Sequence, residues 1–484
     1  MMQHMNFAAI SIEIGIAVLM AAVLVFDLVM KKDAPRSSLA WLTTAGLLGV
    51  LALAVGMYPP EGGAAVFYAG LYIVDGYAMF FKILFIIGVL LTIAFAADYV
   101  EHIMQHRGEF YLLLLSALLG MCVLSSANDL MTAFVGLELM TISFYALTAI
   151  RTDASLSAEA GIKYLIFGSG STAVLLYGMS LVYGMTGTMV FQNIAQGLGL
   201  MLSLGLIGVV FILAGFFFKL SIIPFHLWAP DVYEGAPAPV TALLAMCSKA
   251  AGIAILLRVL FVAFPFLSVY WAHLLAVLAG VSMIGGNLMA FRQTNIKRML
   301  AYSSIAQAGY MMTAMVAANA AGGKAVLFYA MVYVFANVGA FVTVSYLEMK
   351  RGDADMDSVR GLAKESLFPA GILMVSLLTM AGIPPTAGFV GKIYIFSAAI
   401  DAGYLWLAGV GFVMSMISVY YYLLVIKEMF CDVSVEETGA NEPLHLPFPA
   451  YAAGVLSVLF ALVIGIWAEP LSIFSNVAIY TFMR

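Results

Sequence analysis

Residues 216–230 read FFFKLSIIPFHLWAP and place Lys219 and Pro224 inside a long apolar segment. A charge at bilayer depth costs at least ~2.5 kcal/mol on insertion scales, so charged side chains there face a protein interior or a hydrated path. Proline removes a backbone hydrogen-bond donor, and backbone that unwinds at this depth must line a cavity or be buried in protein. The stretch therefore predicts an interrupted membrane helix with a lysine beside the interruption.

The composition is that of a polytopic all-α membrane protein. Hydrophobic residues make up 64% of the 484 residues, charged residues make up 10%, and the mean hydropathy is +1.05, far from the balance of soluble proteins. The net charge of −5 is dispersed over short loops, and without a basic block nucleic acid is not expected as a partner. Cys122, Cys247 and Cys431 are scattered, which predicts neither a metal cluster nor a disulfide framework.

Apolar segments predict about fourteen spans, since a helix that crosses a bilayer needs ~20 apolar residues. They lie near residues 7–30, 39–58, 77–97, 110–127, 129–150, 161–184, 201–225, 238–263, 269–291, 299–319, 323–348, 366–399, 403–428 and 448–468. The first apolar stretch lacks a basic region and a cleavage site, so it is expected to be a retained span. The connections are expected to be short apart from 349–365 and 429–447. Residues 1–484 are therefore predicted to form a single membrane domain.

The 21 lysines and arginines are unevenly distributed over the predicted connections. Thirteen fall in alternate connections: Lys31, Lys32, Arg36, Arg107, Arg151, Arg292, Lys297, Arg298, Lys350, Arg351, Arg360, Lys364 and Lys427. Two fall on the opposite side (Lys324 and Arg484), and six lie within predicted spans (Lys82, Lys163, Lys219, Lys249, Arg258 and Lys392). The positive-inside rule therefore predicts cytoplasmic basic loops and both termini outside.

A second interruption is predicted in the span 366–399, where Pro384 and Pro385 precede Lys392. A single proline in a membrane helix is often only a kink. Two breaks, each near a lysine, favour a transport site built from interrupted helices in corresponding halves. A weak internal echo, Asn128-Asp129 before the fifth span and Asn295 before the tenth, pairs spans four to eight with spans nine to thirteen. This correspondence would pair Lys219 with Lys392.

Five charged residues lie in or at the edge of predicted spans: Glu138, Lys163, Lys219, Lys249 and Lys392. Such residues on successive helices predict a chain of proton or ion sites. The alternative is a set of buried structural ion pairs. Lys82 and Arg258 are expected to snorkel to the surface or to pair structurally.

Residues 218–237, FKLSIIPFHLWAPDVYEGAP, resemble the signature of subunit N of bacterial respiratory complex I, the proton-pumping NADH:quinone oxidoreductase. VGLEL at 135–139, GIKY at 161–164 and GIPPT at 382–386 are similar to the same family. The proline, histidine and tryptophan core is shared by all antiporter-like subunits, whereas the continuation DVYEGAP favours the N type over the M and L types. The L type would also have a long lateral helix, and this chain ends soon after the fourteenth span.

The resemblance implies fourteen helices, broken helices seven and twelve, and two inverted five-helix repeats, here 110–263 and 269–428. It implies a row of charges across the membrane centre, which on this chain is Glu138, Lys219, Lys249 and Lys392. NADH, FMN, iron–sulfur clusters and quinone are expected in partner subunits and none in this chain. The expected partners are the M-type antiporter-like subunit and small membrane subunits, within the lipid bilayer of a bacterial plasma (inner) membrane.

The chemistry of these residues fits the pumping of protons driven by quinone reduction. Desolvation in a membrane disfavours the ammonium form of lysine, and a nearby carboxylate restores it. Glu138 next to Lys219 would then act as a proton-loaded switch. Lys249 would be a relay, and Lys392 would be the terminal group that hands the proton outward.

Two further residues are candidates for the proton path, each with an open alternative. His226 lies seven residues after Lys219, on the same face two turns along if the helix is intact, and histidine titrates near neutral pH. It could equally be a helix-end histidine bonded to backbone. Lys163, near the cytoplasmic end of the sixth span, could serve the access path or snorkel to the surface.

Other functions are compatible with the same residues. A D-type subunit of a multi-subunit sodium/proton antiporter shares the expected fold and lysines, and membrane-bound hydrogenases use an equivalent subunit. A purely structural membrane subunit, whose charges only hold an assembly together, is the alternative from a different class. It predicts near-normal pumping when Lys219 is neutralised.

Overall fold

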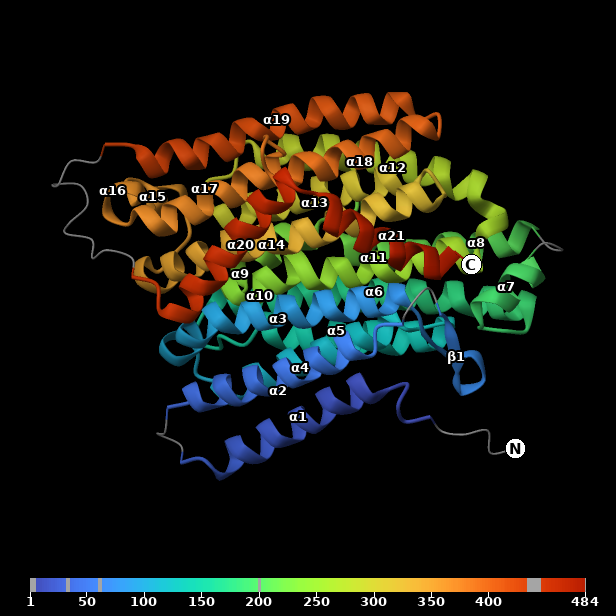
Figure 1. Ribbon diagram of the computed structural model, residues 1–484, viewed down its shortest axis with the longest axis horizontal. Helices are drawn as coiled ribbons and strands as arrows, with labels where there is room; N and C mark the ends of the chain where they lie inside the picture. Colours follow the sequence, from blue (N-terminus) through green and yellow to red (C-terminus); the bar gives the residue numbers. More distant parts are fainter. Residues whose placement is uncertain (1–5, 32–34, 60–62, 199–201, 433–444, 484) are drawn as a thin grey trace.

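The computed structural model describes residues 6–31, 35–59, 63–198, 202–432 and 445–483, which are almost entirely helical (Figure 1). The long helices run side by side along one axis, so successive connections alternate between the two ends of the bundle. Eleven helices are long and apolar enough to cross a membrane. The predicted all-α membrane class is therefore confirmed. Lys32 and Arg484, used in the charge count, lie outside the described residues.

The N-terminal part contains six long helices, a short hairpin and a short helix. Its elements are α1 (Ser11–Val29), α2 (Ser37–Gly56), β1 (Ala65–Phe67), η2 (Tyr68–Gly70), β2 (Tyr72–Val74), α3 (Gly76–Ile103), α4 (Arg107–Ser125), α5 (Leu130–Thr148), α6 (Ser155–Thr186) and α7 (Phe191–Leu198). Strands β1 and β2 pair antiparallel, with Val66 opposite Ile73.

The middle part contains the first interrupted helix and a buried helix with two π-helical turns. Its elements are α8 (Leu202–Leu220), α9 (Trp228–Gly235), α10 (Ala238–Leu243), η3 (Leu244–Ser248), α11 (Lys249–Arg258), η4 (Val259–Ala263), η5 (Pro265–Leu267) and α12 (Ser268–Ala290). The π-helical turn η3 ends directly before Lys249. Such turns are rare and are frequent at functional sites.

The C-terminal part contains the second interrupted helix, formed by α17 and α18. Its elements are α13 (Ile296–Met315), α14 (Ala320–Arg351), α15 (Met356–Val359), α16 (Leu362–Glu365), α17 (Leu367–Ala381), α18 (Ala387–Asp401), α19 (Leu405–Phe430), α20 (Phe448–Ile466) and α21 (Glu469–Met483). Helix α14 and the segment 238–263 are almost completely buried, whereas α1, α6, α19 and α20 are largely exposed. The former pair therefore forms the centre of the bundle, and the latter helices present apolar side chains outward.

Both predicted interruptions are present, and they share their local geometry. Ser221 and Gly382 adopt the left-handed conformation, with φ values of 56° and 81°. The next residue then donates its N–H to a carbonyl five residues back, at 3.0 Å in the first break and 3.1 Å in the second. This bond satisfies a carbonyl at the end of the first half-helix, as in a Schellman motif. Pro224 and Pro385 each follow a cis peptide bond.

The weak sequence echo corresponds to two capping residues at opposite ends of the bundle. Asp129 caps α5 by accepting from Met131 N at 2.9 Å, and Asn295 caps α13 by accepting from Arg298 N at 3.1 Å. Asp129 also forms an isolated antiparallel bridge with Val190, as Asn295 does with Asp355. Helix α7, which follows the first bridge, and α15, which follows the second, lie at opposite ends in Figure 1.

The structure corrects several details of the sequence prediction. The connection between α2 and α3 is long and contains the hairpin, and the connection between α6 and α8 contains α7, so the expectation of only two long connections is wrong. Helix α21 was not predicted; it packs against α3 and α14. Helix α8, helix α13 and the α17–α18 pair are not among the 11 candidate spans.

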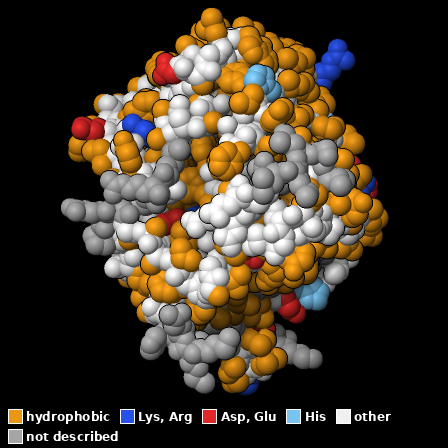
Figure 2. All heavy atoms as spheres, turned by 90° about the vertical axis from the view of Figure 1, so that its right-hand side faces the viewer, with side chains coloured by type: hydrophobic (Ala, Val, Ile, Leu, Met, Phe, Trp, Pro, Cys, Tyr) orange, Lys and Arg blue, Asp and Glu red, His pale blue; other side chains and the backbone are white. Residues whose placement is uncertain are grey.

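The two ends of the bundle differ in their basic side chains. Alternation of the helices places the loops around Arg36, Arg107, Arg151 and Arg360 at the end that holds α15 and α16. The other end, with the hairpin and α7, shows few Lys or Arg side chains in Figure 2. The charge asymmetry found along the sequence is therefore an asymmetry of the folded molecule.

Candidate functional site

Glu138 and Lys219 line one small cavity between α5, α6 and α8, with a volume of about 10 Å³. Thr172 Oγ1 donates to Glu138 Oε1 at 2.8 Å, whereas Lys219 Nζ donates to Tyr164 OH at 3.0 Å. Among the described residues, no ion pair joins the two charged groups, which were predicted to pair. They share a polar cavity whose size is close to that of a single water molecule.

An aromatic cluster surrounds the lysine on its other side. The Lys219 ammonium lies 5.2 Å from the centroid of the Tyr164 ring, and Tyr164 stacks on Trp228 at 4.5 Å. Trp228 Nε1 in turn donates to Phe218 O at 3.1 Å, across the helix break. The sequence FFFKLSIIPFHLW thus folds back so that its tryptophan fixes the tyrosine that bonds the lysine.

Lys249 lies at the centre of the bundle and is held by a single residue of α13. Its ammonium donates to the Ser304 carbonyl at 2.8 Å and to Ser304 Oγ at 2.7 Å. The side chain is buried, and no carboxylate within the described ranges forms an ion pair with it.

Lys392 reaches back across the second break. Its ammonium donates to Ala381 O and to Ser415 Oγ, both at 2.7 Å, and lies 4.8 Å from the centroid of the Tyr310 ring. It also lines a cavity of about 240 Å³ beside the break. The lysine therefore binds polar groups at the end of α17 rather than facing lipid.

Both lysines of the interrupted helices occupy the same kind of position. Lys219 lies in the last turn of α8, and Lys392 binds the last carbonyl of α17. The carbonyl end of a helix carries a partial negative charge, which favours a cation there. Residue for residue, however, the predicted pairing is wrong. Aligning the breaks at the prolines that follow the cis peptide bonds, Pro224 and Pro385, sets Met380 opposite Lys219, because the two lysines lie on opposite sides of their breaks.

The buried cations fall into two groups. Lys82 pairs with Glu13 at 2.8 Å, Arg258 pairs with Asp75 at 2.8 Å, and Lys297 pairs with Glu348 at 2.9 Å. Structural pairing was one of the two expectations for Lys82 and Arg258, and it is confirmed. In contrast, Lys219, Lys249 and Lys392 have hydroxyl and carbonyl partners and no ion pair among the described residues.

The two remaining candidates lie away from this row. Lys163 is partly exposed and forms ion pairs with Glu159 at 2.7 Å and with Asp231 at 2.6 Å, so it belongs to a charged network at the end with the basic loops. His226 lies in the break, where its Nδ1 is buried without a hydrogen-bond partner among the described residues. Because α8 ends at Leu220, the argument from an intact helical face does not apply to it.

Sequence reasoning missed the neutral partners of the three lysines: Tyr164, Ser304, Ser415 and the Ala381 carbonyl. Only Tyr164 had a signal, since it follows Lys163 in the GIKY motif. Hydroxyl groups are common in any helix because they can bond their own backbone, so their sequence positions do not distinguish a partner.

The interrupted helices and the row of buried lysines define an antiporter-like membrane subunit. Residues 127–418 match the family described as NADH:quinone oxidoreductase/Mrp antiporter, TM. A Moorella thermoacetica protein named NADH-quinone oxidoreductase subunit N is 45% identical over 482 residues, covering 99% of both chains. The protein of the same name from Desulfitobacterium hafniense is 45% identical over 491 residues, covering 97% of this chain and 98% of its own. The chain belongs to the family of NADH-quinone oxidoreductase subunit N.

Solved structures agree with this assignment. A chain of respiratory complex I from Thermus thermophilus is 33% identical and has a TM-score of 0.82, covering 95% of this chain and 98% of its own. A chain of the Mrp complex from Dietzia sp. has a TM-score of 0.89 at 22% identity, covering 99% of this chain and 98% of its own. The second similarity is one of fold alone.

Proposed function

We propose that this chain is a proton-translocating membrane subunit of an NADH:quinone oxidoreductase, in which Glu138, Lys219, Lys249 and Lys392 carry the proton. The observation that supports this most is that, within the described residues, the three buried lysines bond hydroxyl and carbonyl groups and form no ion pair. A buried cation whose partners are neutral loses its charge more readily than one in an ion pair, because only the pair offsets the cost of desolvation. The structural alternative calls for ion pairs, which the buried cations Lys82 and Arg258 form.

The proposed mechanism begins at the cavity shared by Glu138 and Lys219. When the lysine is charged, the carboxylate attracts it through a medium of low dielectric with little screening. The Lys219 ammonium then turns from Tyr164 toward the cavity. When an outside perturbation draws the carboxylate away, the lysine returns to its hydroxyl partner and releases its proton toward Lys249. The hydrogen bonds of Lys219 to Tyr164 and of Thr172 to Glu138 support a state in which the two charged groups are not paired.

Lys249 relays the proton, and Lys392 releases it on the outer side. Lys249 is held by Ser304 and Lys392 by Ser415. The hydroxyl group of a serine can both donate and accept a hydrogen bond. Release at Lys392 is supported by the cavity of about 240 Å³ that it lines. His226 and Lys163 remain proposed members of the path, at the first break and at the charged network near the basic loops.

The architecture proposed for this function has fourteen spans, with 110–263 and 269–428 as inverted five-helix repeats. The equivalent breaks, caps and bridges at opposite ends of the bundle support it. The end with the basic loops faces the cytoplasm of a bacterium, and both termini lie outside the inner membrane. Quinone, NADH, FMN and iron–sulfur clusters lie in partner subunits, and the neighbours include the M-type subunit and small membrane subunits.

The test uses the whole complex, purified and reconstituted in proteoliposomes. Lys219→Ala should lower quinone-dependent proton uptake, normalised to assembled complex, by about ten-fold or more, because one positioned proton-transfer group contributes ~10²–10⁴-fold. Lys427→Ala is the matched control, since Lys427 is exposed near the end of α19. Normal uptake by an assembled Lys219→Ala complex would support a purely structural role.

A further inference from the structure

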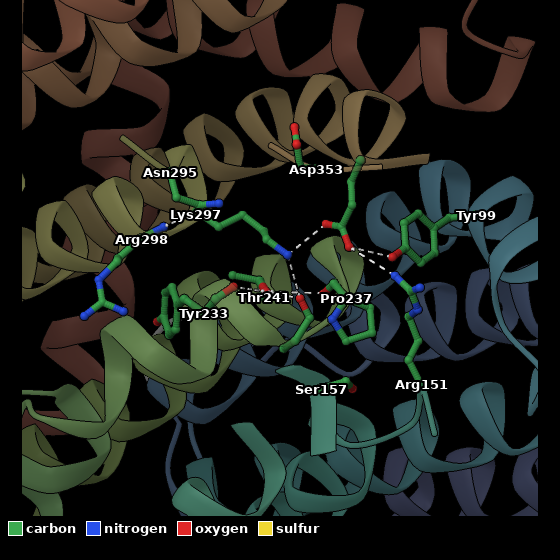
Figure 3. Close-up of polar contacts among 12 residues, drawn as sticks. Tyr99, Arg151, Ser157, Tyr233, Pro237, Thr241, Asn295, Lys297, Arg298 and Asp353 are labelled. Carbon is green, nitrogen blue, oxygen red and sulfur yellow. Dashed lines mark hydrogen bonds and ion pairs between the residues drawn. The ribbon is translucent and has the colours of Figure 1, made fainter. Parts of the chain in front are cut away.

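One buried ion pair lies outside the row of lysines and joins several elements. Lys297 Nζ, on α13, lies 2.9 Å from Glu348 Oε2, on α14, and both side chains are almost fully buried (Figure 3). Glu348 Oε1 accepts from Tyr99 OH, on α3, at 2.8 Å. Arg151, in the connection between α5 and α6, lies 3.8 Å from the same carboxylate oxygen. One carboxylate therefore faces two cations.

The hydrogen bonds of this cluster are incomplete. An ammonium has three donors, and Lys297 uses two, one to Glu348 and one to Ala236 O at 2.9 Å. Arg151 Nε is buried without a partner among the described residues. By comparison, Arg258 is fixed by two bonds to Asp75 and one to the Ser125 carbonyl. Arg258 Nε is likewise buried without a partner among the described residues, but the Arg258 guanidinium makes three hydrogen bonds, whereas the Lys297 ammonium makes two. Because a buried pair stabilises a fold only when its bonds are satisfied, a structural role alone accounts less well for Lys297.

The cluster reaches the surface on one side. The Arg151 side chain is 25% exposed, and it also contacts Asp153, which is 42% exposed. Both lie in the connection at the end of the bundle with the basic loops. The side chains of Arg151 and Asp153 therefore lie between the solvent at this end and the buried Lys297–Glu348 pair.

On the inner side, the cluster points along α13 toward Lys249. Lys297 and Ser304 are seven residues apart, so they share a face two turns apart, about 10.5 Å along the axis. Thr241 Oγ1, 3.3 Å from Ala236 O, shares that carbonyl with Lys297. The Tyr233 hydroxyl is buried without a hydrogen bond among the described residues and lies near Ser304, which holds Lys249.

We propose that the Lys297–Glu348 pair is a proton-loading site that supplies Lys249 from the side of the basic loops. Glu348 holds Lys297 charged. Lys297 passes one proton along the Tyr233 and Ser304 hydroxyls to Lys249 and is reprotonated from solvent past Arg151, so each proton that leaves is replaced. This inference rests on the proposed function, since it assumes that Lys249 carries protons.

Two variants of the whole complex distinguish a proton-loading role of the Lys297–Glu348 pair from a purely structural role. Lys297→Arg keeps the charge and its attraction to Glu348, yet arginine does not release a proton at working pH. Tyr233→Phe removes only the hydroxyl that the proposed route needs, and because no hydrogen bond to it is found among the described residues, folding should not suffer. Glu365→Gln is the control, because Glu365 forms an ion pair with Arg351 outside the proposed route.

The measurement is quinone-dependent proton uptake per assembled complex in proteoliposomes, as a function of external pH. We expect both variants to slow uptake several-fold and to change its pH profile, with the control unchanged. Wild-type uptake and pH profile in Tyr233→Phe overturn the inference even if Lys297→Arg does not assemble. If Lys219→Ala abolishes uptake while these variants pump normally, the proposed function stands and the loading site does not.

Discussion

At the level of single residues, the nature of the partner separates two uses of a buried cation. Lys82 is enclosed with Glu13 and Tyr72, and removing either charge would leave the other unpaired, which typically costs ~3–5 kcal/mol. Lys219, Lys249 and Lys392 form no ion pair within the described residues, so no directly paired carboxylate is left behind when they lose their charge. Their surroundings therefore tolerate both protonation states.

Lys392→Arg tests whether the lysine at the proposed site of proton release must be able to lose its charge. Arginine preserves the charge and can still bond the Ala381 carbonyl, but it does not release a proton at working pH. The variant should assemble and should pump several-fold more slowly than the wild type in reconstituted proteoliposomes. A structural cation would tolerate arginine, so full activity would remove Lys392 from the proton path.

Glu138 should show a graded response. Glu138→Gln keeps an oxygen that can accept from Thr172, so the fold should persist, but it removes the charge that acts on Lys219. Proton uptake should fall strongly. Glu138→Asp keeps the charge and is shorter by one methylene, so its defect should be milder. Equal activity of the three forms in assembled complex would contradict the proposed switch.

At the level of elements, an interrupted helix ends inside the membrane, so its last carbonyl groups can bind a buried cation there. Gly382 turns the chain at φ 81° directly after the carbonyl that Lys392 binds. A β-carbon added there would lie 2.8 Å from Lys392 Cδ, too close for a relaxed contact. The glycine is thus required both by the turn and by the approach of the lysine.

Gly382→Ala should therefore impair pumping and thermal stability more than the backbone conformation alone explains. Gly403→Ala is a matched control, because Gly403 has a φ of 86° and an added β-carbon there meets no atom within 4 Å. Both substitutions carry a left-handed penalty of ~1–2 kcal/mol. Similar melting temperatures and similar proton uptake in the two variants would show that the contact with Lys392 is unimportant.

At the level of the whole molecule, the basic loops gather at the end of the bundle that holds α15 and α16. Reporter fusions after Asp357, which lies in α15, should read cytoplasmic. Fusions after Gly187, beside α7, should read external. The opposite result at either site would reject the proposed fourteen-span orientation.

The all-α membrane class and the two breaks could be predicted from the sequence, for a physical reason. Charges and prolines are so unfavourable in a bilayer that their positions are conspicuous in an apolar chain. The hairpin, α7 and α21 were missed because they are short or lie outside the long apolar segments. The separation of Glu138 from Lys219 and the serine that holds Lys249 depend on how distant helices pack, which residue types alone do not specify.

The most direct measurement of the central claim concerns Lys249, the buried lysine whose side-chain hydrogen bonds within the described residues both go to Ser304. Lys249→Met replaces an unpaired buried charge with an apolar side chain of similar length, so the fold should not be weakened. The variant is purified as assembled complex, and proton uptake is measured per quinone reduced in proteoliposomes, beside Lys427→Met. We predict a clear fall in uptake for Lys249→Met and none for the control. Wild-type uptake by the Lys249→Met complex would contradict the claim that the unpaired lysines carry the proton.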